Sequence, residues 1–245
     1  MASGAGNRFI QETMKGSIGK TDTPKTEGPS LSLPFRGKPL RLPKPNSFKG
    51  KKLTIKQAVT KRKSYRKYSD EPMTLLELSY ALWAMQGIHK QLKKVTLRTV
   101  PSAGARHAFH IIVLVNNVKR LTNGLYLYDA LHHKLQKLDL ANDMPNKLED
   151  ACLGQKMITS SAVTFFYVAD VYRMTSKYKE RGYRYLFLDA GHAVQNLYLV
   201  AEDMDAGTVA IGAYDDQKLN DLFNFNTENY FVIYIAPLGK KTKSK

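Results

Sequence analysis

The chain has 245 residues, of which 43% are hydrophobic and 10% aromatic, so it can bury a core and is not disordered throughout. Its net charge of +17 suggests nucleic acid or an anionic surface, but residues 1–61 carry +10 and residues 240–245 carry +4. The body between these flanks is almost balanced. The single cysteine, Cys152, excludes an intrachain disulfide and a cysteine-rich zinc site.

The first 30 residues are polar, and no stretch approaches the roughly 20 apolar residues of a membrane span. The adjacent pair His132 and His133 has poor geometry for a shared metal, and no cluster of acidic residues and histidines supports it. We therefore expect a cytoplasmic protein without a metal, a membrane span or a nucleic-acid partner.

Residues 1–50 are rich in Gly, Pro, Lys, Ser and Thr, which predicts a basic extended arm that is ordered only where it lies on the body or on a partner subunit. Ordered structure is expected to begin near Leu53. The predicted organisation is therefore an arm over residues 1–50, one domain over residues 51–240 and a basic tail over residues 241–245.

The first helices of the domain have clear start signals. Residues 54–61 predict a short helix that ends in a basic run. Thr74 and Glu77 form a capping-box pattern that opens a second helix, which Gly87 stops. The third expected helix begins at Pro145 and extends to about residue 158.

Short apolar runs predict buried strands, and one long apolar stretch predicts a buried helix. The expected strands cover residues 110–115, 125–129, 134–138, 162–169, 209–211 and 230–236. The long helix covers residues 185–204 and includes His192 as a hydrogen-bonded core histidine, and Asp216 caps a last helix through Leu222. Helices and strands intermix without strict alternation, so the fold class is α+β.

One basic segment has the residue types of a phosphate site. If residues 62–66 are extended, Arg62, Ser64 and Arg66 point to one side. Two guanidinium groups and a hydroxyl suit a phosphate monoester, because arginine makes bidentate, charge-assisted contacts. A solvated basic loop is the ordinary alternative.

Four further segments are candidates, and each also has an ordinary structural explanation. Small residues allow close approach of the backbone to a flat ligand, and adjacent Lys and Tyr can act as base and acid if their surroundings shift their pKa values toward neutrality. The segments are Pro101-Ser102-Ala103-Gly104-Ala105, Ile211-Gly212-Ala213, Lys177-Tyr178 and the C-terminal Lys240-Lys241. The chain has no G-x-G-x-x-G, Walker A or G-x-S-x-G motif.

In their order along the chain, these segments resemble one family. Further matching pieces are Leu82-Trp83-Ala84-x-Gln86-Gly87, Gly124-Leu125-Tyr126-x-Tyr128-Asp129, Arg181-x-Tyr183-Arg184, Asp189-Ala190-Gly191-His192 with Gln195-Asn196, and Leu238-Gly239. Over roughly residues 51–240 the sequence is similar to nitroreductase-like FMN-dependent oxidoreductases, specifically their SagB-type dehydrogenase branch.

The resemblance implies a central mixed or antiparallel sheet flanked by helices, in an intertwined homodimer with FMN at the interface. It implies that Arg62, Lys63, Ser64 and Arg66 bind FMN, its phosphate being held by Arg62, Ser64 and Arg66 with help from Lys240 or Lys241. Residues 101–104 (Pro101, Ser102, Ala103, Gly104) would reach the flavin from the other subunit. Ile211 and Gly212 would contact it through their backbone.

The resemblance further implies hydride transfer from NAD(P)H to FMN in a ping-pong scheme, with Lys177 and Tyr178 as catalytic residues for a small-molecule or modified-peptide substrate. The enzymatic alternative is azoline-to-azole oxidation on a modified peptide. Alternatives of another class are a flavin-binding protein without turnover and a basic nucleic-acid-binding protein.

Overall fold

The apolar runs of the sequence form the central strands of a seven-stranded sheet with the order β1-β6-β5-β4-β7-β9-β8. All neighbouring pairs in this sheet are antiparallel. The structure, a computed structural model, describes residues 4–14, 30–93, 95–140 and 143–242.

The strands are β1 (Leu40–Arg41), β4 (Phe109–Val115), β5 (Gly124–Asp129), β6 (Lys134–Lys137), β7 (Val163–Asp170), β8 (Ala206–Thr208) and β9 (Tyr230–Lys240), with β2 (Ile88–Gln91) and β3 (Thr96–Arg98) as a separate hairpin. The helices are α1 (Ala5–Glu12), α2 (Ile55–Lys61), α3 (Leu75–Gln86), α4 (Met144–Ala151), α5 (Met157–Ser160), α6 (Val171–Tyr178), α7 (Arg181–Asp203) and α8 (Asp216–Leu222).

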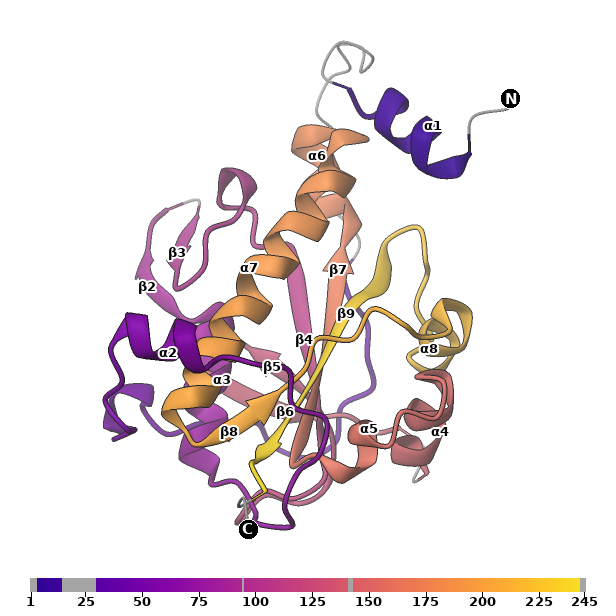
Figure 1. The fold of residues 1–245 in the computed structure, drawn as a ribbon. Helices are drawn as coiled ribbons and strands as arrows, with labels where there is room; N and C mark the ends of the chain where they lie inside the picture. The colour runs from indigo at the N-terminus through magenta and orange to yellow at the C-terminus, as the bar shows by residue number, and fades with distance from the viewer. Residues whose placement is uncertain (1–3, 15–29, 94, 141–142, 243–245) are drawn as a thin grey trace.

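Helices cover both faces of the sheet, which explains why its central strands are apolar without alternation. Ile111 and Val113 of β4 pack in one hydrophobic cluster with α3 and α7, whereas Ile112 and Leu114 pack in a second cluster with α4, α5 and α8. Figure 1 shows α3 and α7 on one side of the sheet and α4, α5 and α8 on the other. The predicted α+β class and the antiparallel central sheet flanked by helices are confirmed.

Local sequence signals predicted the starts of several helices correctly. The capping box of α3 is complete: the Thr74 hydroxyl accepts a hydrogen bond from the Glu77 amide at 3.2 Å, and Glu77 Oε2 accepts one from the Thr74 amide at 2.7 Å. Gly87 ends α3 with φ of −61°, so its role is close packing: a Cβ there would lie 2.2 Å from the Trp83 ring.

Other boundaries differ from the sequence prediction. The helix expected over residues 145–158 is broken into α4 and α5, because Leu153 and Gly154 both have positive φ. The strand expected over residues 209–211 lies earlier, at β8, and Ile211 forms only an isolated bridge with Ile235. Asp215, not Asp216, caps α8. The β2–β3 hairpin and α6 were not predicted.

The long helix α7 begins at Arg181, four residues before the predicted start, and it carries an exposed stripe. His192 lies on this stripe with Leu188, Gly191 and Gln195, so the prediction of a buried core histidine was wrong. The opposite face of α7 is buried against α3 and the sheet.

Ordered structure begins well before Leu53. In the described part of the N-terminal arm, Leu40 and Arg41 pair with β6 at the sheet edge, and Phe35 forms a bridge with Leu138. Helix α1 lies beside α6 in Figure 1, and Arg184 of α7 donates a hydrogen bond to the Ile10 carbonyl at 2.5 Å. The parts of the predicted arm and tail at residues 1–3, 15–29 and 243–245 lie outside the described residues.

Candidate functional site

The basic segment, residues 62–66, is extended and follows α2 directly. Its backbone is held beside β8, because the Tyr65 amide donates to the Thr208 carbonyl at 2.9 Å. Arg62 and Ser64 share one side: the Arg62 guanidinium carbon lies 5.1 Å from the centre of the Tyr198 ring, and Ser64 Oγ lies 3.0 Å from Tyr198 Oη. The alternation expected from an extended chain is therefore present at these two residues.

Tyr198 of α7 also connects the basic segment to the glycine turn, residues 211–212. Its Oη accepts a hydrogen bond from the Ala210 amide at 2.8 Å. The Ile211 amide donates to the Ile235 carbonyl at 2.8 Å and so is occupied within the chain, whereas Gly212 is exposed and a Cβ there would meet only open space. Sequence reasoning missed Tyr198, since an isolated tyrosine in a long helix carries no local signal.

The opposite side of the basic segment meets the end of β9. Lys63 Nζ and Lys241 Nζ lie 5.2 Å and 4.6 Å from the Tyr65 ring centre. Lys241 also pairs with the buried carboxylate of Glu202 at 2.6 Å. Arg66 is exposed.

Lys240 is more enclosed than Lys241. Its Nζ pairs with Glu77, the capping residue of α3, and donates to the Met204 carbonyl at 3.0 Å. The structure thus places both C-terminal lysines against carboxylates of their own chain, whereas Arg62 lies on an aromatic ring without a carboxylate partner among the described residues.

The small-residue loop, residues 101–104, is fixed to the other flank of α7. Ser102 Oγ donates to Asp189 Oδ2 at 2.6 Å, and the Ala103 amide donates to the same oxygen at 3.2 Å. Asp189 is buried; burial raises the pKa of its carboxyl, and the hydrogen bonds from Ser102 and Ala103 act in the opposite direction. The loop is therefore held rigidly by one carboxylate.

The Lys-Tyr pair, Lys177 and Tyr178, lies directly against this loop. A Cβ added to Gly104 would be 2.4 Å from Tyr178 Oη and 2.6 Å from Lys177 Nζ. Gly104 also has φ of +56°, so both its backbone conformation and this close approach require glycine. Two candidate segments separated by more than 70 residues of sequence are thus brought together.

One chain does not join all the candidate residues into one site. The loop and the Lys-Tyr pair lie at Asp189, whereas the basic segment lies at Tyr198, nine residues further along α7. At 3.6 residues per turn, this separation places the two attachment points on opposite flanks of the helix, about 14 Å apart along its axis.

Comparisons with known proteins show the family of this chain. The sequence profile of the nitroreductase family matches residues 59–240, a stretch that includes every candidate site residue except Lys241. The chain belongs to the nitroreductase family. It is accordingly an oxidoreductase, and the family resemblance inferred from the motifs is confirmed.

Two relatives match this nitroreductase-family chain, one over most of its length and one over less than half. It is 31% identical over 189 residues to a protein of Methanocaldococcus jannaschii that is named a nitroreductase, a match that covers 77% of this chain and 92% of the relative. It is 29% identical over 109 residues to the trifolitoxin-processing protein of Rhizobium leguminosarum bv. trifolii, covering 43% of this chain and 29% of that protein.

The fold comparison shows that the chain shares the fold of a solved nitroreductase. A solved structure from Ralstonia eutropha JMP134, named a nitroreductase, superposes with a TM-score of 0.67 at 23% identity. The match covers 89% of this chain and 97% of that one, so the family fold is present nearly whole.

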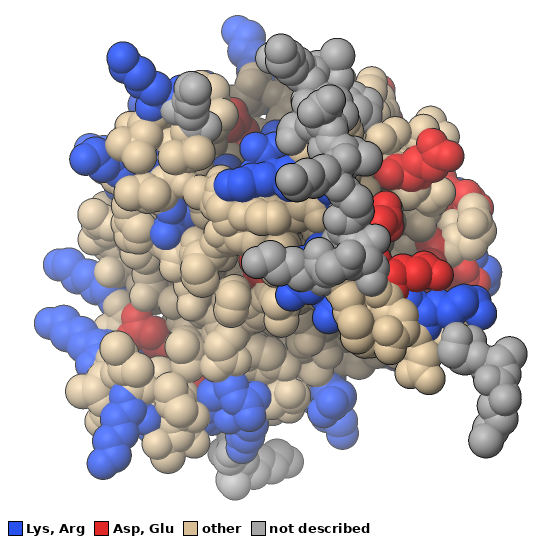
Figure 2. Space-filling model, turned by 90° about the horizontal axis from the view of Figure 1, so that it is seen from above, with Lys and Arg blue, Asp and Glu red and all other residues tan. Residues whose placement is uncertain are grey.

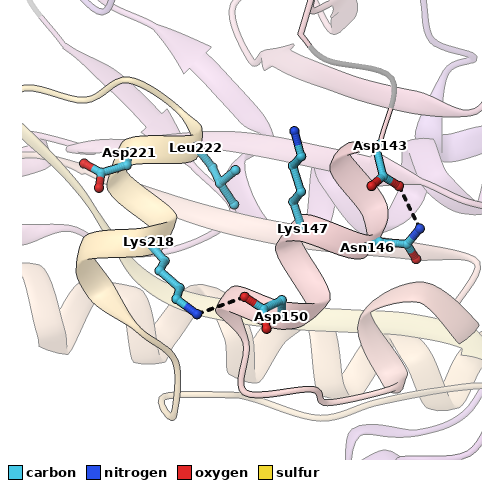
Figure 3. Close-up of a pocket in the computed structure, with 7 residues that line it drawn as sticks. All are labelled: Asp143, Asn146, Lys147, Asp150, Lys218, Asp221 and Leu222. Atoms are coloured by element: carbon cyan, nitrogen blue, oxygen red, sulfur yellow. Dashed lines mark hydrogen bonds and ion pairs between the residues drawn. The ribbon is translucent and has the colours of Figure 1, made fainter.

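A groove lies on the face of the sheet opposite to α7, away from the candidate site residues. The groove between α4 and α8 has a volume of about 570 Å³ and carries the ion pair Lys218–Asp150 at 2.9 Å, which Figure 3 shows at its edge. None of the predicted site residues lines it. Among the described residues there is no cluster of three or more metal-ligating side chains and no helix long and apolar enough to cross a bilayer.

Proposed function

We propose that this chain is an FMN-dependent oxidoreductase that uses reduced nicotinamide as electron donor. The observation that carries the proposal is the cluster of Arg62, Ser64 and Tyr198 beside the open position at Gly212. Arg62 and Ser64 offer charged and neutral donors for a phosphate, and Gly212 leaves space for a flat ring. The residues present therefore fit FMN.

The proposal includes a homodimer, because the two halves of the candidate site lie on opposite flanks of α7. Between those flanks the helix exposes Leu188, Gly191 and Gln195, and the Leu188 side chain is 59% exposed. Large apolar side chains on one exposed helix face, here Phe187 and Leu188, favour an interaction surface. A second copy packed on the stripe supplies the loop and the Lys-Tyr pair that the first copy lacks beside its basic segment.

The chain's own residues bind and orient the reactants in this proposal. FMN, when bound, supplies the hydride chemistry. The basic segment holds the phosphate end, and the loop fixed by Asp189 limits the cleft in which nicotinamide and acceptor bind in turn. The sequence has no G-x-G-x-x-G motif. This is consistent with a shared cleft, because a nicotinamide that binds there needs no separate dinucleotide-binding fold.

A second candidate reaction is azoline oxidation on a modified peptide, and the Lys-Tyr pair favours it. Lys177 Nζ and Tyr178 Oη both lie beside Gly104, so the deprotonated form of either group could take a substrate proton at the loop while bound FMN would accept the hydride. The similarity to a trifolitoxin-processing protein supports a peptide substrate. Lys240 and Lys241 are weaker candidates for the phosphate, because both are paired with carboxylates.

A nucleic-acid-binding function has less support. Figure 2 shows Lys and Arg scattered over the upper face of the molecule, with Asp and Glu gathered on the side of α4 and α8. Nucleic-acid binding requires a continuous basic surface.

An absorbance spectrum of the purified protein tests the proposal. Flavin bands that bleach under anaerobic conditions with NADH or NADPH are expected. A colourless protein that binds no added FMN contradicts flavin binding, and a yellow protein that neither nicotinamide bleaches contradicts the proposed donor.

A further inference from the structure

A cationic pocket lies beside the small-residue loop, between the β2–β3 hairpin, residues 105–107 and α6. Its volume is about 340 Å³. Its lining includes four cationic side chains and no carboxylate; the cations are Lys93, Arg98, Arg106 and Arg173. Four like charges around one cavity repel one another, so an anion in the cavity stabilises them.

The three arginines are held in place by their own chain. Arg98 donates to Gln86 Oε1 at 2.6 Å, and Arg106 donates to the Ser176 hydroxyl at 3.0 Å. Arg173 pairs with Asp170, at the end of β7, at 3.2 Å. Each guanidinium still keeps at least one terminal nitrogen without an acceptor among the described residues, so all three retain donors for a ligand.

His107 adds an unpartnered buried acceptor to this pocket. The residue is 4% exposed, and its Nε2 lies 3.0 Å from the Thr96 carbonyl oxygen, which can only accept. Nε2 therefore carries the proton of the neutral ring, and Nδ1 is a bare acceptor. Nδ1 is buried and has no hydrogen-bond partner among the described residues. Such a group is rare and costly unless a water molecule or a ligand satisfies it.

The surroundings of His107 favour this neutral form. Burial, and with it the positive charges of Arg98 and Arg173, lowers the pKa of His107 to about 4, while the bond to Thr96 acts in the opposite direction. The pKa of Arg98 is lowered for the same two reasons, burial first and then the positive charge of Arg173, to about 10.

We propose that this pocket binds a phosphate monoester. Its negative oxygens accept from Arg98, Arg106 and Arg173, and its remaining acidic proton is donated to Nδ1 of His107. A phosphate monoester has a second pKa of about 6 and so keeps a proton on part of its population near neutral pH. Carboxylate and sulfate are fully deprotonated there and supply charge but no proton.

The position of the pocket links it to the Lys-Tyr pair. Arg106 bonds to the Arg173 carbonyl and to Ser176, the residue before Lys177, so the pocket lies next to the helix that carries the Lys-Tyr pair. The phosphate group belongs either to the nicotinamide nucleotide NADPH, which carries a phosphate monoester that NADH lacks, or to a small phosphorylated substrate.

Proton–nitrogen correlation NMR of the histidine rings tests the proposal on the protein as purified. The His107 signals are assigned by their loss in His107→Asn. Inorganic phosphate is expected to shift them at millimolar concentration and sulfate to shift them less. An unchanged His107 signal, or equal binding of sulfate and phosphate, overturns the proposal.

Variants and a second probe sharpen the result. Arg98→Met and the exposed Lys93→Gln are expected to weaken phosphate binding, the former by about tenfold or more. Arg66→Gln, in the basic segment, is the matched control. If Arg66→Gln loses the His107 response and Arg98→Met keeps it, phosphate does not bind in this pocket. A response to NADPH but not to NADH identifies the nucleotide as the source, and a response to phosphate alone identifies a small ester. Because the NMR signal reports on His107 alone, the phosphate test remains valid even if the protein does not bind flavin.

Discussion

The hydroxyl groups of Ser64 and Tyr198 lie 3.0 Å apart, which joins the basic segment to the longest helix of the fold. The same tyrosine accepts the Ala210 amide and carries Arg62 over its ring. One side chain therefore sets the relative positions of a proposed phosphate site and the glycine turn.

Replacement of Arg62 by alanine is expected to weaken FMN binding. The substitution removes a charge-assisted contact of about 1.5–3 kcal/mol, which corresponds to an affinity loss of about 10- to 100-fold. Fluorescence titration of the apoprotein with FMN measures it. Lys67→Ala, at an exposed residue of the same stretch, is the control. Equal affinities of Arg62→Ala and the parent would refute the assignment.

Tyr198→Phe tests the connection between the two segments. The Ala210 amide loses its acceptor, at a cost of about 1 kcal/mol for this partly buried bond, so the midpoint of thermal unfolding is expected to fall by about 2–4 °C. FMN affinity should fall with it, because Ser64 loses its partner. Tyr172→Phe serves as a control outside the site. A loss of stability without any loss of FMN affinity would restrict Tyr198 to a structural role.

Leu188→Glu tests the dimer. The glutamate places a charge on the exposed stripe of α7, so light scattering is expected to show dissociation, and flavin should be lost with the partner subunit. Leu153→Glu is a matched control, since both leucines are more than half exposed. A stable, flavin-loaded monomer of the parent protein would disprove the shared site.

The Lys-Tyr pair is tested by separating the two half-reactions. Lys177→Ala and Tyr178→Phe are expected to leave FMN content and reduction by nicotinamide nearly unchanged, because that hydride transfer needs no protein base. Oxidation of an azoline substrate should fall by about 10²- to 10⁴-fold, as for a lost general base. Equal, small losses in both half-reactions would mean that the pair only shapes the cleft.

His107 is expected to make the protein sensitive to acid. Its pKa falls from 6.5 to about 4 on folding, so below 6.5 the unfolded chain binds a proton that the folded chain refuses. The contribution of His107 to the free energy of unfolding is fully present above pH 6.5 and is lost as the pH falls toward 4. The loss is on the order of 3 kcal/mol at most.

Chemical denaturation across this pH range measures the effect. His107→Asn should flatten the slope of unfolding free energy against pH. A slope that is the same in His107→Asn and in the parent would exclude His107 as its origin.

The sequence by itself determined the features that depend on neighbours along the chain. The capping box of α3 and the apolar runs of β4 and β7 were predictable, because caps involve residues three positions apart and strand burial follows from a local run. The order of small, basic and aromatic motifs was enough to indicate the family. The break between α4 and α5 was missed, since a positive φ at Leu153 has no sequence signal.

Only the tertiary structure decided which distant residues meet. Lys240 resembled a phosphate ligand in sequence. Strand β9, however, places it beside Glu77, and the lysine forms an ion pair with that carboxylate. Gly104 and Lys177 come together because α6 and the loop lie on one flank of α7, and the cations around His107 gather from three separate elements. Such contacts are set by the order of strands and the facing of helices, which the local pattern of a sequence does not contain.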